Sequence, residues 1–132
     1  MTDQPNQYKF DEIKIGLEYK FTEMITESHL DSFANLSGDY NPLHMDAGYA
    51  KTTRFKKRIC HGMLLASFFS KLVGMYLPGK NALYFSQTIN FQNPCFVDDI
   101  ITVRGQVVDK SDSTKIITLD TSIHNQDAMC LV

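Results

Sequence analysis

The sequence predicts an α+β fold in which a curved antiparallel β-sheet wraps around one long central helix. Residues 62–77 are apolar around almost the whole helical circumference, which is typical of a helix that is buried on most sides. Three β-rich runs with partial period-two alternation follow this segment, and a strand-like run precedes it. In a chain of 132 residues, only a curved sheet offers enough surface to cover such a helix.

One strand and one capped helix are predicted near the N-terminus. Residues 17–25 are rich in strand-forming side chains. Thr26 follows as a good helix N-cap, and Ile25 and Leu30 stand at the two positions of a hydrophobic staple. The pair Ser37-Gly38 ends the helical spacing, so a helix is expected between Thr26 and that pair.

A loop, a short helix and a basic connection come next. Residues 39–43 contain an Asn-Pro pair and are predicted to form a turn or loop. Asp46 is placed to cap a short helix that reaches residue 50. Residues 51–58 form a basic connection without clear periodicity.

The long helix and the sheet occupy the remainder of the chain. The breaker pair Pro78-Gly79 is expected to close the helix. The antiparallel strands are predicted at residues 82–92, 99–110 and 114–124, with the start of a further strand at 128–132.

Composition excludes several classes of protein. The net charge of −2, without a basic stripe, excludes nucleic acid as a partner. The most apolar run is too short and too polar to cross a membrane, and no secretory signal is visible, so a cytoplasmic protein is expected. Three widely spaced cysteines indicate reduced, mostly buried thiols and no zinc site. We expect a single domain over residues 1–132, with residues 1–7 as a flexible N-terminal tail.

The strongest candidates for catalysis are Asp39 and His44, which flank a rigid loop. Asn41 lies between them and is followed by a proline, which restricts the backbone on both sides. Such a loop is suited to aim a carboxylate and an imidazole at one water molecule, the arrangement that general acid–base chemistry needs. Taken alone, the pattern is also compatible with capping or solvated side chains.

A second cluster lies where the long helix begins. Free backbone N–H groups at a helix N-terminus attract developing negative charge, and Gly62 allows a ligand to approach closely. A thioester carbonyl needs such a donor when its oxygen becomes enolate-like. An acid–base pair together with an oxyanion donor is what hydration of an α,β-unsaturated thioester requires. The neighbouring His61 is interpreted as mainly structural.

The segment 33–50 resembles the signature of the MaoC-like, (R)-specific enoyl-CoA hydratase (hydratase 2) family. Its core reads L-S-G-D-x-N-P-L-H at residues 36–44. Residues 58–67 are similar to the second block of that family, and the likeness extends from about residue 8 to the C-terminus. Three positions depart from the family pattern: Cys60, Asp98 and the end of the chain at Val132, which comes before the expected end of the last strand.

The resemblance implies a hot-dog fold and a role for each site residue. Asp39 and His44 would activate water and protonate C2 of a trans-2-enoyl thioester, giving an (R)-3-hydroxyacyl thioester. The backbone N–H of Gly62 would be the oxyanion donor, Asn41 would support the loop or contact water or substrate, and Ser70 corresponds to a serine of the family. It also implies a homodimer or a dimer of dimers, and no metal or cofactor beyond the CoA or phosphopantetheine of the substrate.

Other functions stay open at the level of sequence. A 3-hydroxyacyl-carrier-protein dehydratase of fatty-acid or polyketide synthesis would run the same chemistry in reverse. Thioester hydrolysis and a non-catalytic acyl-thioester binding subunit are further alternatives. A positive cluster is either a solvated connection or a patch for the phosphates of CoA or of a phosphopantetheine arm; it consists of Lys51, Arg54, Lys56, Lys57 and Arg58.

Overall fold

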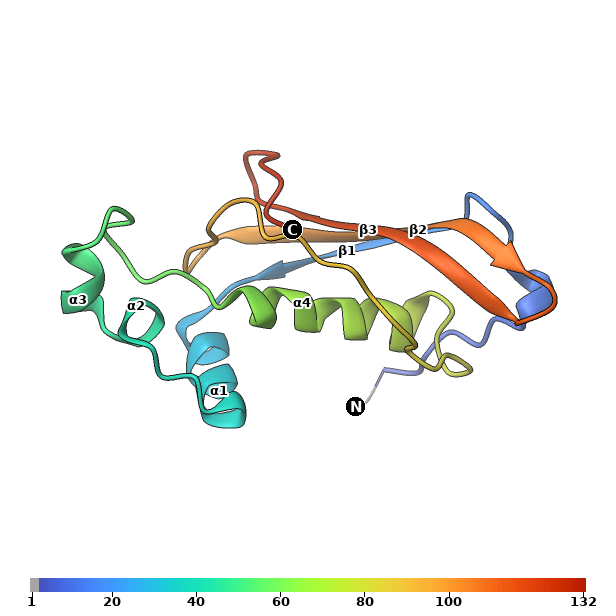
Figure 1. The fold of residues 1–132 in the computed structure, drawn as a ribbon, viewed down its shortest axis with the longest axis horizontal. Coiled ribbons are helices and arrows are strands. Elements are labelled where there is room, and N and C mark those ends of the chain that lie inside the picture. Colours follow the sequence, from blue (N-terminus) through green and yellow to red (C-terminus); the bar gives the residue numbers. More distant parts are fainter. Residues whose placement is uncertain (1–2) are drawn as a thin grey trace.

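A three-stranded antiparallel sheet with one helix lying along its face forms the body of the molecule (Figure 1). The computed structural model describes residues 3–132. The strands are β1 (Glu18–Met24), β2 (Ile100–Ser111) and β3 (Ile116–His124), in the spatial order β1-β2-β3. The three predicted strands at these positions are therefore confirmed, to within two residues at each end.

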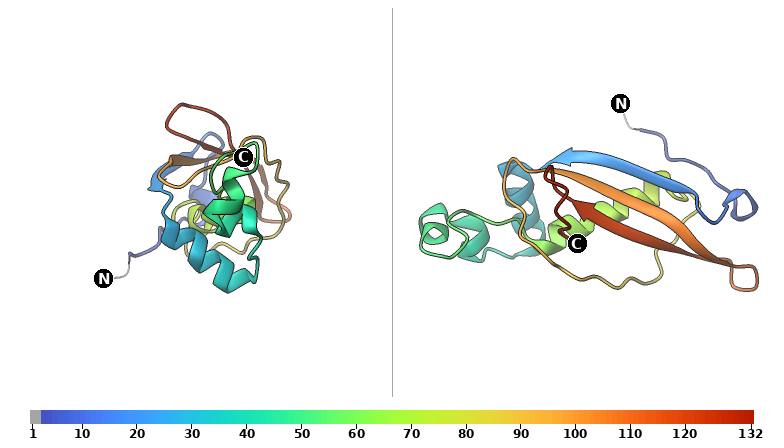
Figure 2. Two further views of the ribbon diagram at one scale, coloured as in Figure 1. Left: turned by 90° about the vertical axis from the view of Figure 1, so that its left-hand side faces the viewer. Right: turned by 90° about the horizontal axis from the view of Figure 1, so that it is seen from above.

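The central helix consists of α4 (Gly62–Lys71) and a π-helical turn, η2 (Leu72–Tyr76). Both follow the inner face of the sheet (Figure 2). Leu72 on the helix is fully buried, and a methyl group on Gly105 of β2 would come within 2.6 Å of the Leu72 side chain. The glycine in β2 therefore allows the helix to approach the sheet closely.

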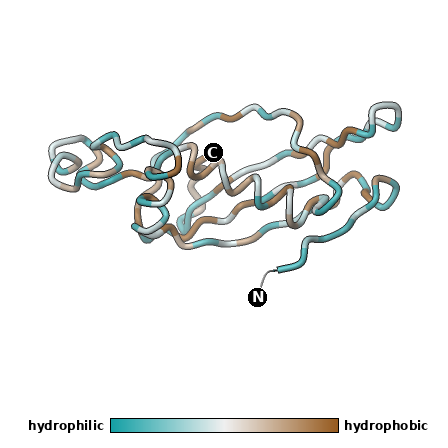
Figure 3. The backbone as a smooth tube through the Cα atoms, turned by 90° about the horizontal axis from the view of Figure 1, so that it is seen from below, coloured by the Kyte–Doolittle hydropathy of each residue, from teal (hydrophilic) through white to brown (hydrophobic). Residues whose placement is uncertain are grey.

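The hydrophobic core lies between the helix and the sheet. Alternate residues of β2 point inward, as expected for a sheet with one buried face. The core cluster includes Leu64, Leu65, Phe69, Leu72, Ile101, Val103 and Ile123. Figure 3 shows hydrophobic residues concentrated along this part of the molecule, whereas the N-terminal segment is largely hydrophilic.

The central helix is buried or half-buried on most sides, as predicted, and its extent agrees with the predicted 62–77. It is open along one stripe, formed by the exposed residues Met63, Ser67, Ser70 and Gly74. Met63 is 56% exposed, and Phe68 and Val73 are half-buried. The sheet itself is narrower than predicted, because residues 82–92 form no strand.

Residues 82–92 run beside the sheet without pairing to it. The predicted strand needs a neighbour to bond its backbone, but a cavity of about 750 Å³ separates residues 81–88 from the edge of β3. Only at Gln92, whose N–H donates to the Leu131 carbonyl at 2.9 Å, does the segment reach a strand-like neighbour. Residues 128–132 likewise make an isolated bridge, between His124 and Cys130, and no regular strand.

Three short helices form an overhang at one end of the sheet (Figure 1). They are α1 (Glu27–Ser37), α2 (Pro42–Met45) and α3 (Ala47–Lys51). The predicted N-cap of α1 is confirmed, because the Thr26 hydroxyl accepts a hydrogen bond from the His29 N–H at 3.2 Å. Gly38 ends the helix in the left-handed region at φ 80°.

The predicted loop at 39–43 is shorter than expected, because α2 already begins at Pro42. Asn41 accepts a hydrogen bond from the Leu43 N–H at 3.0 Å, and proline is well suited to the first helical position. Asp46 caps α3 as predicted, through the Tyr49 N–H at 3.0 Å. The overhang is thus a chain of three capped helices.

The N-terminal segment is tied to the far end of the central helix. Residues 1–2 of the predicted flexible tail lie outside the described residues. The Asn6 N–H donates to the Met75 carbonyl at 2.8 Å, and Gln7 forms a bridge with Gly79. These contacts tie Asn6 and Gln7 to the body of the molecule, and the flexible tail over residues 1–7 stays a prediction. A single 3₁₀ turn, η1 (Phe10–Glu12), connects the segment to β1.

The cysteines and the possibility of a membrane-spanning helix were also addressed by the sequence. Cys60 and Cys95 are buried, Cys130 is half-buried, and all three are free, as predicted. Within the described chain, no helix has both the length and the apolar character that a membrane span requires.

Candidate active site

The loop between α1 and α2 is held by hydrogen bonds of its own polar side chains. The Asp39 N–H donates to the Ser37 hydroxyl at 3.1 Å, and Asp39 Oδ1 accepts from the Asn41 N–H at 3.1 Å. Asn41 in turn caps α2. Each polar side chain thus supports a residue two positions along the chain, which fixes the position of the exposed Asp39 carboxylate.

His44 lies on α2 and is oriented by the segment that leads into the central helix. Its Nδ1 lies 2.8 Å from the carbonyl oxygen of Ile59. Because a carbonyl only accepts, Nδ1 carries a proton there, and Nε2 is the nitrogen left for chemistry. Arg58 also donates through Nε to the His44 carbonyl at 2.5 Å. Residues 58 and 59 therefore hold both the backbone and the ring of His44.

His61 joins the two candidate catalytic residues. Its ring stacks on that of His44, with 4.1 Å between centroids and 27° between planes. Its Nε2 lies 3.1 Å from the Asp39 carbonyl oxygen, so the ring donates to the loop. The ring is 2% exposed and packs against Phe33 at 4.8 Å on another side. His61 is a structural residue, as predicted. It contacts both candidate catalytic residues, through the Asp39 carbonyl and the His44 ring.

The arrangement brings Asp39 and His44 close enough to share one water molecule. A carboxylate oxygen of Asp39 and one ring nitrogen each of His44 and His61 lie within 4.8 Å of one another. Two hydrogen bonds of about 2.8 Å to a single water span such a separation. The predicted pairing of Asp39 with His44 is therefore present in the structure.

The same three residues have the donor types of a metal site, but their nitrogens are largely engaged. His61 directs Nε2 to the Asp39 carbonyl, and its Nδ1 is buried. His44 directs Nδ1 to the Ile59 carbonyl. This leaves one carboxylate and one imidazole nitrogen facing outward, fewer than the three protein ligands of a typical catalytic zinc site. The geometry favours an acid–base pair.

Gly62 is the first residue of α4 and follows His61 directly. Among the described residues no acceptor bonds its N–H, as expected for the first donors of a helix. A methyl group at this position would lie 3.0 Å from the Phe91 ring. A free amide therefore lies one residue from the histidine that stacks on His44, with an aromatic ring above it.

Ser70 is not brought to this site. It is exposed and lies eight residues beyond Gly62 on the same helical stretch. At 1.5 Å per residue, that is about 12 Å along the axis. The family likeness gave Ser70 as a site residue, but in the single chain it has no contact with the Asp39–His44 pair.

Two contributions to the site escaped the sequence interpretation. Phe91 covers Gly62 from a segment nearly thirty residues further along the chain, and Ile59 contributes only a carbonyl group. A backbone carbonyl leaves no mark in the sequence. The Cys-His-Gly spacing did mark the position of His61 but not its stacking on His44.

Burial lowers the pKa of His61, and its Nδ1 has no hydrogen-bond partner among the described residues. An unpartnered nitrogen in a buried ring favours the neutral form. That form contributes stability that is fully present above the ordinary pKa of 6.5 and is lost as the pH falls toward the lowered value.

We expect His61→Gln to reduce the acid sensitivity of folding. The glutamine amide is able to donate to the Asp39 carbonyl but does not titrate. The measurement is the free energy of unfolding at neutral pH and at about pH 5, compared with the control His124→Gln on β3. The wild type and the control should lose more stability on acidification than His61→Gln, and an equal loss in all three would contradict the assignment.

The family comparison agrees with this geometry. A model of the family described as MaoC like domain matches residues 10–128. The (R)-specific enoyl-CoA hydratase of Aeromonas caviae is 40% identical over 114 residues, which cover 86% of this chain and 85% of that protein. A mitochondrial 3-hydroxyacyl-[acyl-carrier-protein] dehydratase of Arabidopsis thaliana is 34% identical over 89 residues, covering 67% of this chain and 52% of that protein.

Solved structures share the fold. The R-hydratase of Pseudomonas aeruginosa in its unliganded form superposes with a TM-score of 0.92 at 35% identity, covering 98% of this chain and 83% of that one. The expected fold, a hot-dog of one central helix and an antiparallel sheet, is confirmed by this likeness and by the arrangement of α4 and the strands.

Proposed function

Since this chain belongs to the MaoC-like domain family, we propose that it is an (R)-specific enoyl-CoA hydratase. It is a hydro-lyase that adds water to a trans-2-enoyl thioester and yields an (R)-3-hydroxyacyl thioester. The observation that carries the proposal is the Asp39–His44 pair, whose carboxylate oxygen and ring nitrogen lie within 4.8 Å, beside the free amide of Gly62.

In the proposed reaction Asp39 acts as the base toward water. The carboxylate takes one proton from the bound water while the water oxygen bonds to C3 of the substrate. Asp39 suits this role because both its backbone and its side chain are held in place. His61 donates to its backbone carbonyl, and the Asn41 N–H donates to its Oδ1. The carboxylate is positioned before the substrate arrives, so little reorganisation is needed in the reaction.

The thioester oxygen is stabilised by the Gly62 N–H. As the C3–O bond forms, the double-bond electrons move toward the carbonyl and the oxygen becomes enolate-like. A helix N-terminus places a donor and a partial positive charge at that point. The Phe91 ring packs against Gly62 and gives this end of the site an apolar wall, beside which an electrostatic interaction is stronger than in water.

His44 completes the addition by supplying the proton to C2. The Ile59 carbonyl accepts from Nδ1–H and holds the ring, and in the reaction a proton carried by Nε2 passes to C2. The proton on Asp39 then passes to Nε2 and restores both groups. The cycle consumes one water and one enoyl thioester and no other reactant, so it requires no cofactor beyond the CoA or phosphopantetheine that the substrate carries.

The experiment that tests the proposed function follows the loss of the enoyl-thioester absorbance. Purified protein is given crotonyl-CoA and longer trans-2-enoyl-CoA substrates, and the 3-hydroxyacyl product is resolved by chirality. An (R) product supports the proposal. Absence of turnover at every chain length, or an (S) product, would defeat it, and binding of the thioester without turnover would indicate a binding subunit instead.

A 3-hydroxyacyl-carrier-protein dehydratase is the second candidate. The likeness to the Arabidopsis dehydratase favours it, although that likeness covers less of both chains than the likeness to the hydratase. Both directions share one transition state. The ratio of kcat/KM for a CoA thioester and for the matching carrier-protein thioester distinguishes the two candidates.

We further propose that the protein works as a homodimer or a dimer of dimers. The segment 82–92 exposes a run of large apolar side chains, with Leu83 91%, Phe85 79% and Phe91 52% exposed. An exposed apolar segment beside a half-covered helix is typical of a surface that a second protein copy covers. Light scattering should give twice or four times the mass of the chain, and Leu83→Glu with Phe85→Glu should shift it to the monomer.

A further inference from the structure

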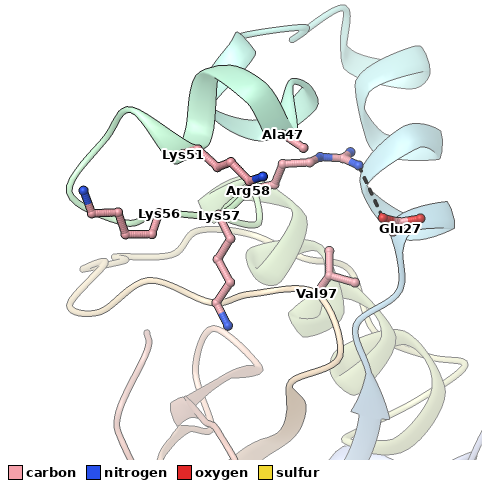
Figure 4. A pocket seen from close by; sticks show the side chains of 7 residues that line it. All are labelled: Glu27, Ala47, Lys51, Lys56, Lys57, Arg58 and Val97. Carbon is pink, nitrogen blue, oxygen red and sulfur yellow. Dashed lines mark ion pairs between the residues drawn. The ribbon is translucent and has the colours of Figure 1, made fainter.

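A small basic pocket lies between the overhang and the body of the molecule (Figure 4). It has a volume of about 200 Å³. Four of its seven lining residues carry positive charge and one carries negative charge. The lining consists of Glu27, Ala47, Lys51, Lys56, Lys57, Arg58 and Val97.

Arg58 is committed to the structure and not to a ligand. Its guanidinium pairs with Glu27 at 3.8 Å and with Asp31 at 3.4 Å, and its Nε donates to the His44 carbonyl. Glu27, the acidic residue of the lining, is thereby occupied as well. Figure 4 shows that Lys56 and Lys57 reach away from this ion pair.

The three lysines of the pocket lack an acidic partner within the described chain. No carboxylate of residues 3–132 lies within ion-pair distance of Lys51, Lys56 or Lys57. Lys57 rests its ammonium group 4.6 Å above the Phe96 ring, a contact that leaves its N–H donors free. Three lysine side chains that line one hollow, and whose long stems let the ammonium groups reorient, attract an anion, and phosphate is a typical partner of lysine.

The backbone holds one of these lysines, Lys56, in an unfavourable conformation. Lys56 has φ 67°, in the left-handed region that non-glycine residues rarely adopt, at the end of a turn closed by its own N–H and the Thr53 carbonyl at 3.2 Å. An unfavourable conformation kept in an exposed turn indicates that the direction of the chain matters there. Lys56 and the following Lys57 both line the pocket.

The pocket lies beside the candidate active site, because Arg58 of its lining donates to the His44 carbonyl. Lys57 precedes Gly62 by five residues, so at most about 18 Å of extended chain separates them. The pantetheine arm, which joins a thioester to the nearest phosphate through two amide units, has a similar reach of about 15 Å when extended. The separation of Lys57 from Gly62 is therefore bounded by a length comparable with that of the arm.

We propose that Lys51, Lys56 and Lys57 bind the phosphate group at the end of the substrate's pantetheine arm. The assignment rests on the proposed function, because it takes the substrate to be a thioester of CoA or of a carrier-protein phosphopantetheine. Both sources carry this phosphate. The lysines act on binding of the arm and do not touch the reacting carbons.

The test compares four crotonyl thioesters that differ only beyond the sulfur: those of CoA, dephospho-CoA, 4′-phosphopantetheine and N-acetylcysteamine, the last of which has no phosphate. Lys56→Glu/Lys57→Glu is compared with wild type and with Lys14→Glu/Lys20→Glu, two exposed lysines before and within β1. The control pair changes the net charge equally. KM and kcat are measured at low ionic strength, where screening is weak.

We expect the pocket variant to raise KM at least about tenfold for the three phosphate-bearing thioesters, with kcat little changed. With N-acetylcysteamine it should match wild type within about twofold, as should the control pair with every substrate. Lys56→Gln/Lys57→Gln should show the same pattern more weakly, because it removes attraction without adding repulsion.

Three results would overturn the proposal: an unchanged KM for crotonyl-CoA, an equal rise for the substrate without phosphate, and a rise confined to CoA. The last would assign the lysines to the 3′-phosphate of CoA, which the pantetheine arm does not carry. Failure of the wild type on all four thioesters is a different result, and it would defeat the proposed function itself.

Discussion

Replacing Asp39 by asparagine is expected to lower kcat for the hydration of crotonyl-CoA by about 10²–10⁴-fold, the usual contribution of a positioned acid or base. The substitution removes the basic oxygen that takes a proton from water. It leaves the loop in place, because the amide oxygen still accepts from the Asn41 N–H, which lies 3.1 Å from Oδ1 in the wild type. The His61 contact goes to the backbone carbonyl of residue 39 and does not depend on the side chain.

The matched control is Asp46→Asn in the same overhang. Asp46 also uses Oδ1 to hold a nearby N–H, that of Tyr49 at 3.0 Å, and asparagine is an equally good N-cap. Initial rates and thermal unfolding are measured for both variants. The control should keep the wild-type rate and both should keep the wild-type melting temperature. An Asp39→Asn protein that hydrates as fast as wild type would exclude Asp39 as the base.

Local signals account for the parts of the fold that the sequence predicted. Thr26 and Asp46 were identifiable as caps because a capping side chain acts on the backbone two or three residues away. The strand at 100–111 was identifiable because one face of it is buried, so its side chains alternate. Both signals are complete within a few residues of sequence.

Signals that depend on a distant partner were not predictable in the same way. Residues 82–92 have strand composition, but a strand exists only where a neighbour bonds to it, and here a cavity of about 750 Å³ intervenes. The central helix, apolar on nearly all sides in sequence, is likewise open along one stripe in the single chain. The apolar composition of these two segments indicates that their side chains tend to be buried. The single chain does not provide enough surface to bury all of them.

The candidate site also contains some features that local sequence predicts and others that depend on distant residues. Asp39, His44 and Gly62 were predicted because their chemical types and spacing are part of the reaction. The stacking of His44 on His61, and the carbonyl that fixes its Nδ1, depend on the path of the chain between the overhang and α4. Those contacts decide which nitrogen of His44 is left to meet a water molecule, and they form only once the chain is folded.

Replacing Gly62 by proline is expected to lower kcat about 10²–10³-fold relative to Gly62→Ala, the effect of losing one oxyanion donor. Proline removes the N–H and no other hydrogen bond of the described chain, because that N–H has no protein acceptor. The helix tolerates proline at its first position, and His61, at φ −58° and ψ 132°, already has the extended conformation that a residue before proline adopts.

Gly62→Ala is the matched control because it adds the same Cβ toward the Phe91 ring, 3.0 Å away, but keeps the donor. The cost of fitting that Cβ against Phe91 is therefore common to both variants. Thermal unfolding should place the two variants at similar melting temperatures, and kcat should separate them. If the proline variant turns over as fast as the alanine variant, the oxyanion is bound elsewhere, and the start of α4 contributes only the shape of the site.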